Sequence, residues 1–327
     1  MPTRVTILLT LATLCCPACA VEDEEGAEPR MLPGTGSGSG GGTVFNTNVV
    51  DGEALSELLQ PMGEEHHGVA LVSVTLAGGR QVDHFEVEGG DIVAHDKLGG
   101  VAIGEQLIGS RWQFSGPYAE YAQPAVIKGR TLIEGVPHYR FMEGFETLMP
   151  STCIAGADAI HARLLTGFTL DEASGEVEAL HNNTYIACLS GATAKAAAWG
   201  YYDEVPVERD DFGPFEAAIR VVRADYCYDG VAHTHAGVPL LVEDVWEVRG
   251  PLDEVEAEAP LEALWGLDRL ICAGTGRYED IPGACAATGV KIPKCAEGST
   301  LADYPEAVFL TRLPGALSEA LPGIVVP

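Results

Sequence analysis

Six cysteines between positions 153 and 295 constrain the fold of this 327-residue chain more than any other sequence feature. They are Cys153, Cys188, Cys227, Cys272, Cys285 and Cys295. An even number of cysteines in an oxidising compartment is typical of a disulfide framework, for which six cysteines allow fifteen pairings. Zinc binding is the alternative, but zinc ligands usually come in pairs two to four residues apart, and no two of the six are that close. The spacing favours disulfides and leaves their pairing open.

The other three cysteines lie in residues 1–19, which have the pattern of an export signal: Arg4, then a short apolar run, then small residues. Cleavage after Ala18 would leave Cys19 as a lipidated N-terminus, whereas cleavage after Ala20 would give a soluble secreted product. Residues 20–43 are acidic and then almost entirely Gly and Ser, so we expect a disordered tether, which favours lipidation. We therefore expect an extracytoplasmic protein of the cell envelope, either an outer-membrane lipoprotein or a secreted protein.

The formal net charge is −29, which repels nucleic-acid phosphates and anionic membrane surfaces. We therefore expect no nucleic-acid partner, and membrane attachment only through the N-terminal lipid. No segment reaches the roughly 20 apolar residues that a membrane-spanning helix needs. The sequence identifies no particular protein or glycan partner.

Residues 44–212 read as one β-rich domain, because short apolar runs bounded by Gly or Pro follow one another with little helical periodicity. This pattern is typical of a sandwich or barrel-like arrangement. The runs are 69–76, 81–87, 91–95, 101–108, 111–114, 125–128, 131–136, 139–141, 159–165 and 184–189. Short helices are expected over 53–60 and 192–199.

Residues 213–327 read as a cysteine-bearing region packed on the first domain. Apolar residues at helical spacing predict helices over 215–226 and 261–271, and Glu262 would lie in the first turn of the second helix. The predicted fold class is a β-rich α+β fold. Its N-terminal half is dominated by strands, and its disulfide-stapled C-terminal half carries short helices.

Candidate chemistry is sparse. His233 and His235 are one residue apart, so on a strand they would share a face and could bind a metal with a nearby carboxylate such as Asp244. Two-residue motifs are common by chance, so we expect no metal, no cofactor and no identifiable catalytic residue. The leading hypothesis is a structural or interaction module. The alternative is an extracytoplasmic, metal-dependent hydrolase using His233 and His235.

The run Arg223, Ala224, Asp225, Tyr226 and Cys227 resembles the motif of the ADYC domain, a family of exported bacterial proteins. The resemblance extends over roughly residues 100–315 and includes Thr184, Cys188, Gly230, Thr234, Gly237, Asp244, Leu261, Glu262, Trp265, Cys272 and Arg277. It implies an envelope or secreted domain, often lipid-anchored, with no established activity to transfer.

Two departures from the family pattern bear on the disulfides. The family usually carries cysteines at the positions of Ala196 and Ala218, and the loss of both implies that those two sites pair with each other. The pairing then expected for the remaining six is Cys153–Cys188, Cys227–Cys272 and Cys285–Cys295. Within the motif, we expect structural roles, with Asp225 capping a backbone turn and Arg223 pairing with a buried carboxylate.

Overall fold

The computed structural model describes residues 44–45, 65–66, 69–115, 125–133, 135–142, 161–171, 174–189, 191–203, 205, 211–235, 237–277 and 280–314. The predicted leader, tether and helix over 53–60 lie outside these residues, as do Cys19 and Cys153. Within the described part of the chain, no helix is both long and apolar enough to cross a membrane.

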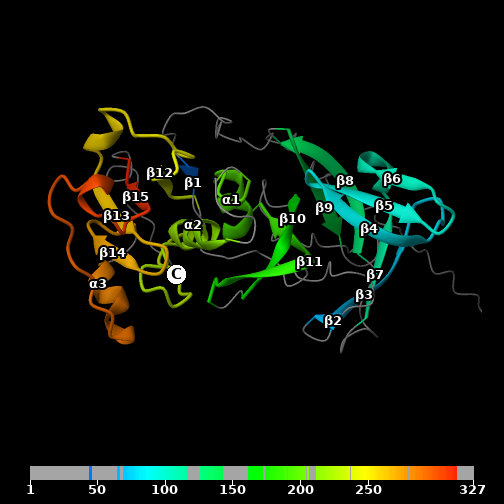
Figure 1. Cartoon of the computed structure of the whole chain (residues 1–327), viewed down its shortest axis with the longest axis horizontal. Helices are drawn as coiled ribbons and strands as arrows, with labels where there is room; N and C mark the ends of the chain where they lie inside the picture. The colour runs from blue at the N-terminus through cyan, green and yellow to red at the C-terminus, as the bar shows by residue number, and fades with distance from the viewer. Residues whose placement is uncertain are drawn as a thin grey trace, which may run out of the picture. The chain divides into compact units, whose positions relative to one another are not determined.

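Seven strands form the larger sheet of the N-terminal half, in the order β11-β10-β9-β8-β7-β3-β2, with every neighbouring pair antiparallel (Figure 1). Their bounds are β2 Glu65–His66, β3 Val69–Thr75, β7 Arg111–Ser115, β8 Ala125–Ile133, β9 Val136–Met142, β10 Ala162–Leu170 and β11 Val177–Cys188. The sheet ends at β2 and β11, so among the described residues it is open and does not close into a barrel.

The core of this sheet follows from alternation along its strands. Ile127 on β8, with Tyr139 and Phe141 on β9, faces a buried cluster that also holds Trp112 from β7. The runs 125–128 and 131–136, expected as two strands, meet within β8, where the register shifts between Ile127 and Gly129. Glycine inside a strand commonly marks such a bulge, and the sequence pattern was therefore broken without the strand ending.

A three-stranded sheet, β4-β5-β6, packs against the same cluster. It consists of β4 Val82–Glu88, β5 Asp91–Asp96 and β6 Val101–Ile103, followed by a 3₁₀ turn over Gly104–Leu107. Phe85 and Val87 face the core, and the alternate residues of β4 are exposed. The β4–β5 turn is made by Gly89 and Gly90, both with positive φ, a conformation that glycine adopts readily.

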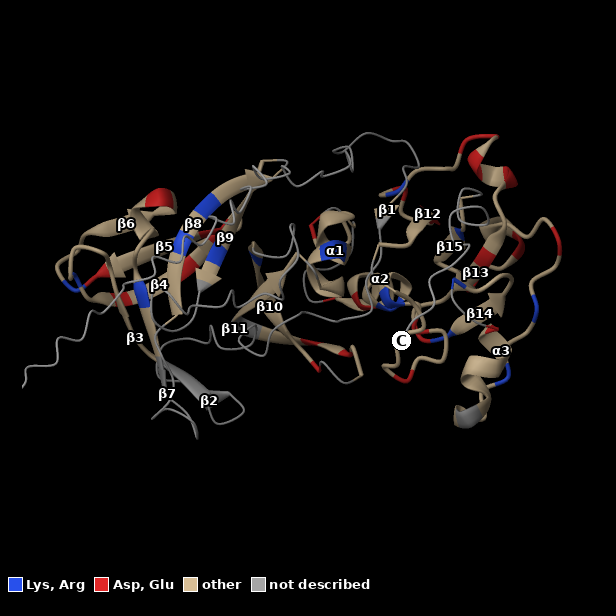
Figure 2. Ribbon diagram, turned by 180° about the vertical axis from the view of Figure 1, so that it is seen from behind, with Lys and Arg blue, Asp and Glu red and all other residues tan. Residues whose placement is uncertain are grey.

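An ion pair joins the two sheets. Figure 2 shows basic residues on β8 and β9, and one of these, Arg130, donates two hydrogen bonds of 2.8 Å to Asp91 on β5. The Tyr139 hydroxyl donates a third, of 2.5 Å, to the same carboxylate. Burial would raise the pKa of Asp91, but the hydrogen bonds from Arg130 and Tyr139 hold it below its ordinary value.

Helices and a third sheet, of five strands, form the rest of the described chain. The helices are α1 Ala192–Ala198, α2 Gly213–Arg223 and the short α3 Ile281–Ala284, with 3₁₀ turns over Cys285–Thr288, Glu256–Glu258 and Leu301–Asp303. The five-stranded sheet has the order β1-β12-β15-β13-β14. Its strands are β1 Val44–Phe45, β12 Pro239–Asp244, β13 Leu261–Trp265, β14 Leu270–Ala273 and β15 Phe309–Arg312. The helices predicted over 192–199 and 215–226 are present as α1 and α2, but α2 ends at Arg223, and the predicted last turn over 224–226 is not helical.

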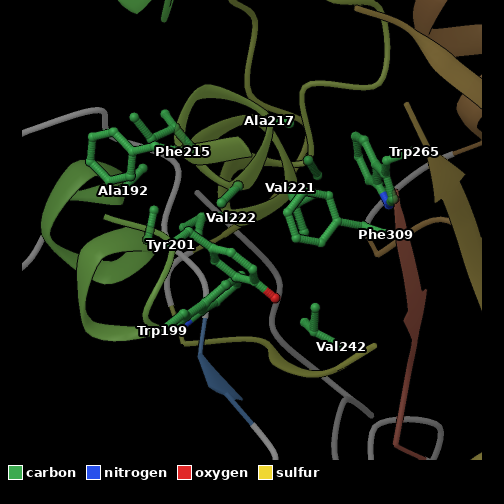
Figure 3. Close-up of a cluster of buried hydrophobic side chains, with 14 of the residues drawn as sticks. Ala192, Trp199, Tyr201, Phe215, Ala217, Val221, Val222, Val242, Trp265 and Phe309 are labelled. Carbon is green, nitrogen blue, oxygen red and sulfur yellow. The ribbon is translucent and has the colours of Figure 1, made fainter. Parts of the chain in front are cut away.

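One large hydrophobic cluster holds these elements together (Figure 3). Phe215 and Val222 from α2 meet Tyr201, which follows α1, and Trp265 and Phe309 from the five-stranded sheet. The cluster also contains β10 and β11 residues, so it draws side chains from both sides of the predicted domain boundary between 212 and 213. The predicted β-rich α+β class, with short helices and disulfides in the C-terminal half, is confirmed.

The helix predicted over 261–271 is wrong. This segment is the β13–β14 hairpin, with the Gly266 N–H donating to the Arg269 carbonyl in the turn. Leu264 pairs with Leu310 and Trp265 with Phe309 on β15. Because β13 is buried on both faces, its apolar residues do not alternate, and the 3.6-residue spacing of its leucines arose without a helix.

Buried His138 on β9 gives a testable pH dependence. Its Nδ1–H donates to the Val136 carbonyl at 2.9 Å, and burial lowers its pKa to about 4, an effect to which the charges of Arg163 and His161 add. The unfolded chain takes up this proton near pH 6.5, whereas the folded chain does so only near pH 4. The stabilisation from neutral His138 is therefore complete above pH 6.5 and falls as the pH drops, by about 3 kcal/mol in total.

The measurement is the free energy of unfolding in urea at several pH values between 7 and 4. The variant His138→Gln should lose less stability across this window than the parent protein. His235 is exposed, so His235→Gln serves as the control and should keep the parental slope. Equal slopes for the parent and His138→Gln would contradict the assignment.

Candidate functional site

The family-motif segment begins where α2 ends. Ala224 is fully buried and adopts the left-handed conformation with φ 55°, which is unusual for a residue other than glycine. The Asp225 N–H then donates to the Arg220 carbonyl at 2.9 Å. The chain thus turns back over the last turn of its own helix, as in the common helix-ending motifs. This reversal places Asp225 of the motif beside α2.

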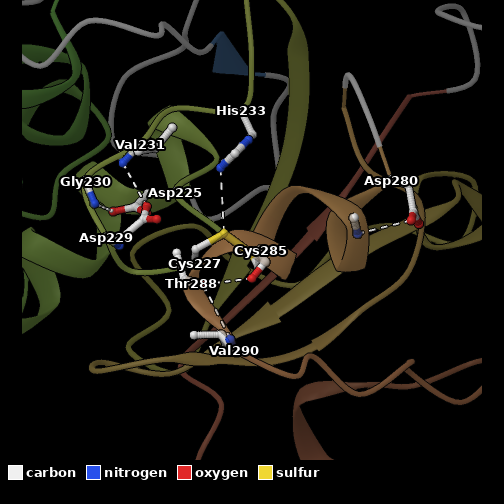
Figure 4. The surroundings of a disulfide bond; sticks show 11 residues. Asp225, Cys227, Asp229, Gly230, Val231, His233, Asp280, Cys285, Thr288 and Val290 are labelled. Carbon is white, nitrogen blue, oxygen red and sulfur yellow. Dashed lines mark hydrogen bonds between the residues drawn. A yellow bond between two sulfur atoms is a disulfide. The ribbon is translucent and has the colours of Figure 1, made fainter.

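Asp225 is completely buried and holds the turn that follows. Its carboxylate pairs with the Arg220 guanidinium at 2.7 Å and accepts the N–H groups of Asp229 and Gly230, each at 3.1 Å (Figure 4). Burial raises the pKa of Asp225, while Arg220 and the two N–H donors oppose this rise. The predicted turn-capping role of Asp225 matches this geometry.

The predicted ion pair of Arg223 is wrong, because Arg220 makes it instead. The chain reversal brings Asp225 next to Arg220, one turn earlier on α2, and Arg223 donates through Nη2 to the Gly230 carbonyl. Among the residues that the structure describes, Arg223 Nε and Nη1 are buried without a hydrogen-bond partner, and burial lowers the pKa of this guanidinium. Arg223 therefore supports the turn through the Gly230 carbonyl and makes no ion pair with a described carboxylate.

Tyr226 leads to a second buried network. Its hydroxyl donates to Glu262 Oε1 at 2.6 Å, and Arg277 Nε donates to the same oxygen at 2.6 Å. Arg277 also reaches the carbonyls of Val221 and Val222 at the end of α2, at 2.5 and 3.0 Å. The side chains of Glu262 and Arg277 are both 0% exposed. This network connects the motif, β13 and the segment after β14.

Sequence reasoning missed the function of this network. Glu262 was assigned to the first turn of a helix, and Arg277 was noted only through the family resemblance. A signal was present, because Glu262 lies within the apolar run Leu261–Trp265, and a charged residue buried in such a run needs a partner. The sequence does not reveal which of the chain's basic residues provides it.

Among the described residues, two disulfides crosslink the C-terminal half: Cys227–Cys285, whose surroundings Figure 4 shows, and Cys272–Cys295. The predicted pairs Cys227–Cys272 and Cys285–Cys295 are therefore wrong. The segment before Cys295 lies along β14, where the Cys295 N–H donates to the Ala273 carbonyl at 2.9 Å. This contact brings Cys295 beside Cys272. Cys188 is also disulfide-bonded, and its predicted partner Cys153 lies outside the described residues.

The residues of the hydrolase hypothesis are not brought together. Asp244 accepts hydrogen bonds from the Tyr201 hydroxyl and from the N–H groups of Trp246, Val248 and Arg249, at 2.6–3.3 Å. These donors occupy both of its carboxylate oxygens. His235 is exposed, whereas His233 is buried, with its ring stacked on that of Tyr226.

The possible metal ligands that do gather at His233 are Cys227 and Asp229, all within 4.8 Å of one another. Cys227 is bonded to Cys285, however, and a disulfide sulfur is not the thiolate that zinc requires. Two ligands then remain among the described residues, fewer than the three that zinc sites use. The His233 Nε2 atom lies 3.7 Å from Cys227 Sγ, so this histidine packs against the crosslink.

These features define an extracytoplasmic, disulfide-crosslinked domain whose motif side chains serve its own folding, since disulfides form and persist in oxidising compartments. The family model of the ADYC domain matches residues 104–279, more than half of the chain, and the protein belongs to the ADYC domain family. Searches of curated proteins and of solved structures found no match.

Proposed function

We propose that this protein is an envelope module, anchored by a lipid on Cys19, that acts by binding or by its structure and not by catalysis at the family motif. The observation that carries the proposal is that the motif side chains are buried and bonded to other residues of the same domain. Asp225, Tyr226 and Cys227 are all buried, and their functional groups are engaged by Arg220, Glu262 and Cys285. A catalytic centre needs convergent groups that a substrate can reach.

The anchoring part of the proposal rests on the order of segments in the sequence. The export-type leader, Cys19 and the acidic, Gly/Ser-rich stretch precede the folded domain. A flexible linker of this composition lets a domain reach away from the surface that holds its first residue. The net charge of −29 would keep such a domain off anionic lipid, so its contacts would be made with other molecules.

The test is the Cys19→Ser variant, expressed at full length in a Gram-negative host. We expect the parent protein to enter the detergent phase of a phase-separation assay and to carry diacyl and acyl mass. Cys19→Ser should lose both properties. Cys15→Ser is the matched control, because it removes a thiol from the same leader and should leave the lipid in place. An unmodified mature protein that starts at Val21 would overturn the anchoring proposal.

A further inference from the structure

The outward face of the β4–β5 hairpin carries two histidines and a glutamate in register. His84 on β4 pairs directly with His95 on β5, and Glu86 lies two residues along β4 on the same face. The two imidazole rings are stacked, with their centroids 4.6 Å apart and an interplanar angle of 7°. Directly paired residues of an antiparallel ladder are the closest cross-strand neighbours that a sheet offers.

One contact within this group has the separation expected of two ligands of one metal ion. His95 Nε2 lies 3.1 Å from Glu86 Oε1. Two ligand atoms that each lie about 2.0–2.2 Å from a zinc ion are themselves about 3.0–3.5 Å apart. His84 Nδ1 lies 3.3 Å from an Asp83 carboxylate oxygen.

The group is both accessible and supported. The side chains of His84, Glu86 and His95 are 63%, 54% and 29% exposed, so an ion can reach them. On β4, Phe85 lies between His84 and Glu86, and Val87 follows Glu86. Both Phe85 and Val87 pack into the core and fix the strand. The ligand atoms of His84, His95 and Glu86 do not all lie within 4.8 Å of one another in the described rotamers, so binding requires the exposed His84 side chain to turn toward Glu86.

We propose that His84, His95 and Glu86 form a surface site for a divalent transition-metal ion, with Zn²⁺ as the probe. Two imidazoles and one carboxylate suit zinc and copper, whereas magnesium and calcium prefer sites made of oxygen ligands. A protein with net charge −29 also raises the local concentration of cations. Three protein ligands leave the fourth position of zinc to water.

The experiment is calorimetric titration of the folded, disulfide-intact protein with ZnCl₂ at pH 7.5 in the presence of excess Mg²⁺. We expect one Zn²⁺ ion per chain at this site. The variants His84→Gln, His95→Gln and Glu86→Gln should each weaken binding by about tenfold or more, since the loss of even an orienting partner costs 10–100-fold. In NMR spectra, the ring signals of both histidines should shift together during the titration.

Two variants serve as controls. Glu88→Gln removes an exposed acid from the same strand, and His235→Gln removes an exposed histidine elsewhere. Both should bind Zn²⁺ as the parent protein does. The proposal is overturned if the double variant His84→Gln/His95→Gln keeps the parental affinity and stoichiometry, if Mg²⁺ displaces the zinc, or if the parent protein binds none. Circular dichroism of each variant establishes that the fold is retained.

Discussion

Arg277→Met is expected to lower the free energy of unfolding by about 3–5 kcal/mol, the cost of leaving a buried charge without its partner. Arg277 Nε lies 2.6 Å from Glu262 Oε1, and neither side chain is exposed. After the substitution, the Tyr226 hydroxyl would be the one donor to the Glu262 carboxylate left among the described residues, where its second oxygen, Oε2, is buried without a partner. Urea unfolding at pH 7, followed by far-ultraviolet circular dichroism, measures the loss.

The matched control is Arg269→Met, which removes an arginine that is 63% exposed and lies 4.0 Å from an exposed Asp268. An exposed pair of this kind contributes at most about 1 kcal/mol. The double variant Glu262→Met/Arg277→Met should be less destabilised than Arg277→Met alone, because no unpaired charge remains. Equal stability of Arg277→Met and Arg269→Met would show that the network does not hold the motif.

Removal of the Cys227–Cys285 crosslink, as the double variant Cys227→Ala/Cys285→Ala, is expected to cost about 4 kcal/mol of unfolding free energy. The bridge joins residues 58 positions apart, and the stabilisation follows from the restriction that it places on the unfolded chain. The same urea experiment under non-reducing conditions measures the effect. A loss of this size is a large part of the 5–15 kcal/mol typical of a folded domain.

The comparison variant is Cys272→Ala/Cys295→Ala. Its bridge spans 23 positions, so the expected loss is about 3 kcal/mol. Trypsin cleaves between all four of these cysteines, which lets mass spectrometry read the pairing directly. The linked peptides should be 224–249 with 278–291, and 270–277 with 295–312. A linked pair of 278–291 with 295–312 would contradict the bridges described above.

The sequence predicted the strand-rich half well, because strands with one exposed face leave a visible pattern. On β4, exposed His84 and Glu86 alternate with inward-facing Phe85 and Val87, and glycines end the strand. Such alternation is local information, and no knowledge of the partner strand is needed to read it.

The same reasoning failed where burial is two-sided. On β13, Leu264 and Trp265 are successive and both fully buried, between β14 on one edge and β15 on the other. Without alternation, the leucine spacing was mistaken for a helix. Gly266 makes the turn between these strands, where an added Cβ would lie about 3.2 Å from the Arg269 and Glu306 carbonyl oxygens.

The motif interactions were only half predictable. The capping role of Asp225 is encoded within six residues, so it could be expected from the motif. The Glu262–Arg277 pair and both disulfides depend on how β13 and β14 pack against the end of α2, which the order of residues does not reveal. The disulfides were expected to join consecutive cysteines along the chain. The fold instead joins Cys227 to Cys285 and Cys272 to Cys295.

The two bridges interlace along the chain, because Cys272 lies inside the loop closed by Cys227–Cys285, and its partner Cys295 lies outside that loop. Of these four cysteines, a chain that enters an oxidising compartment from its N-terminus exposes Cys227 and Cys272 first, and a bond between these two would be the wrong isomer. Maturation then requires either that Cys227 and Cys272 stay reduced until Cys285 has entered the compartment, or that thiol–disulfide exchange replaces a Cys227–Cys272 bond. The yield of correctly bridged molecules would depend on the oxidoreductases of the compartment as much as on the stability of the folded domain.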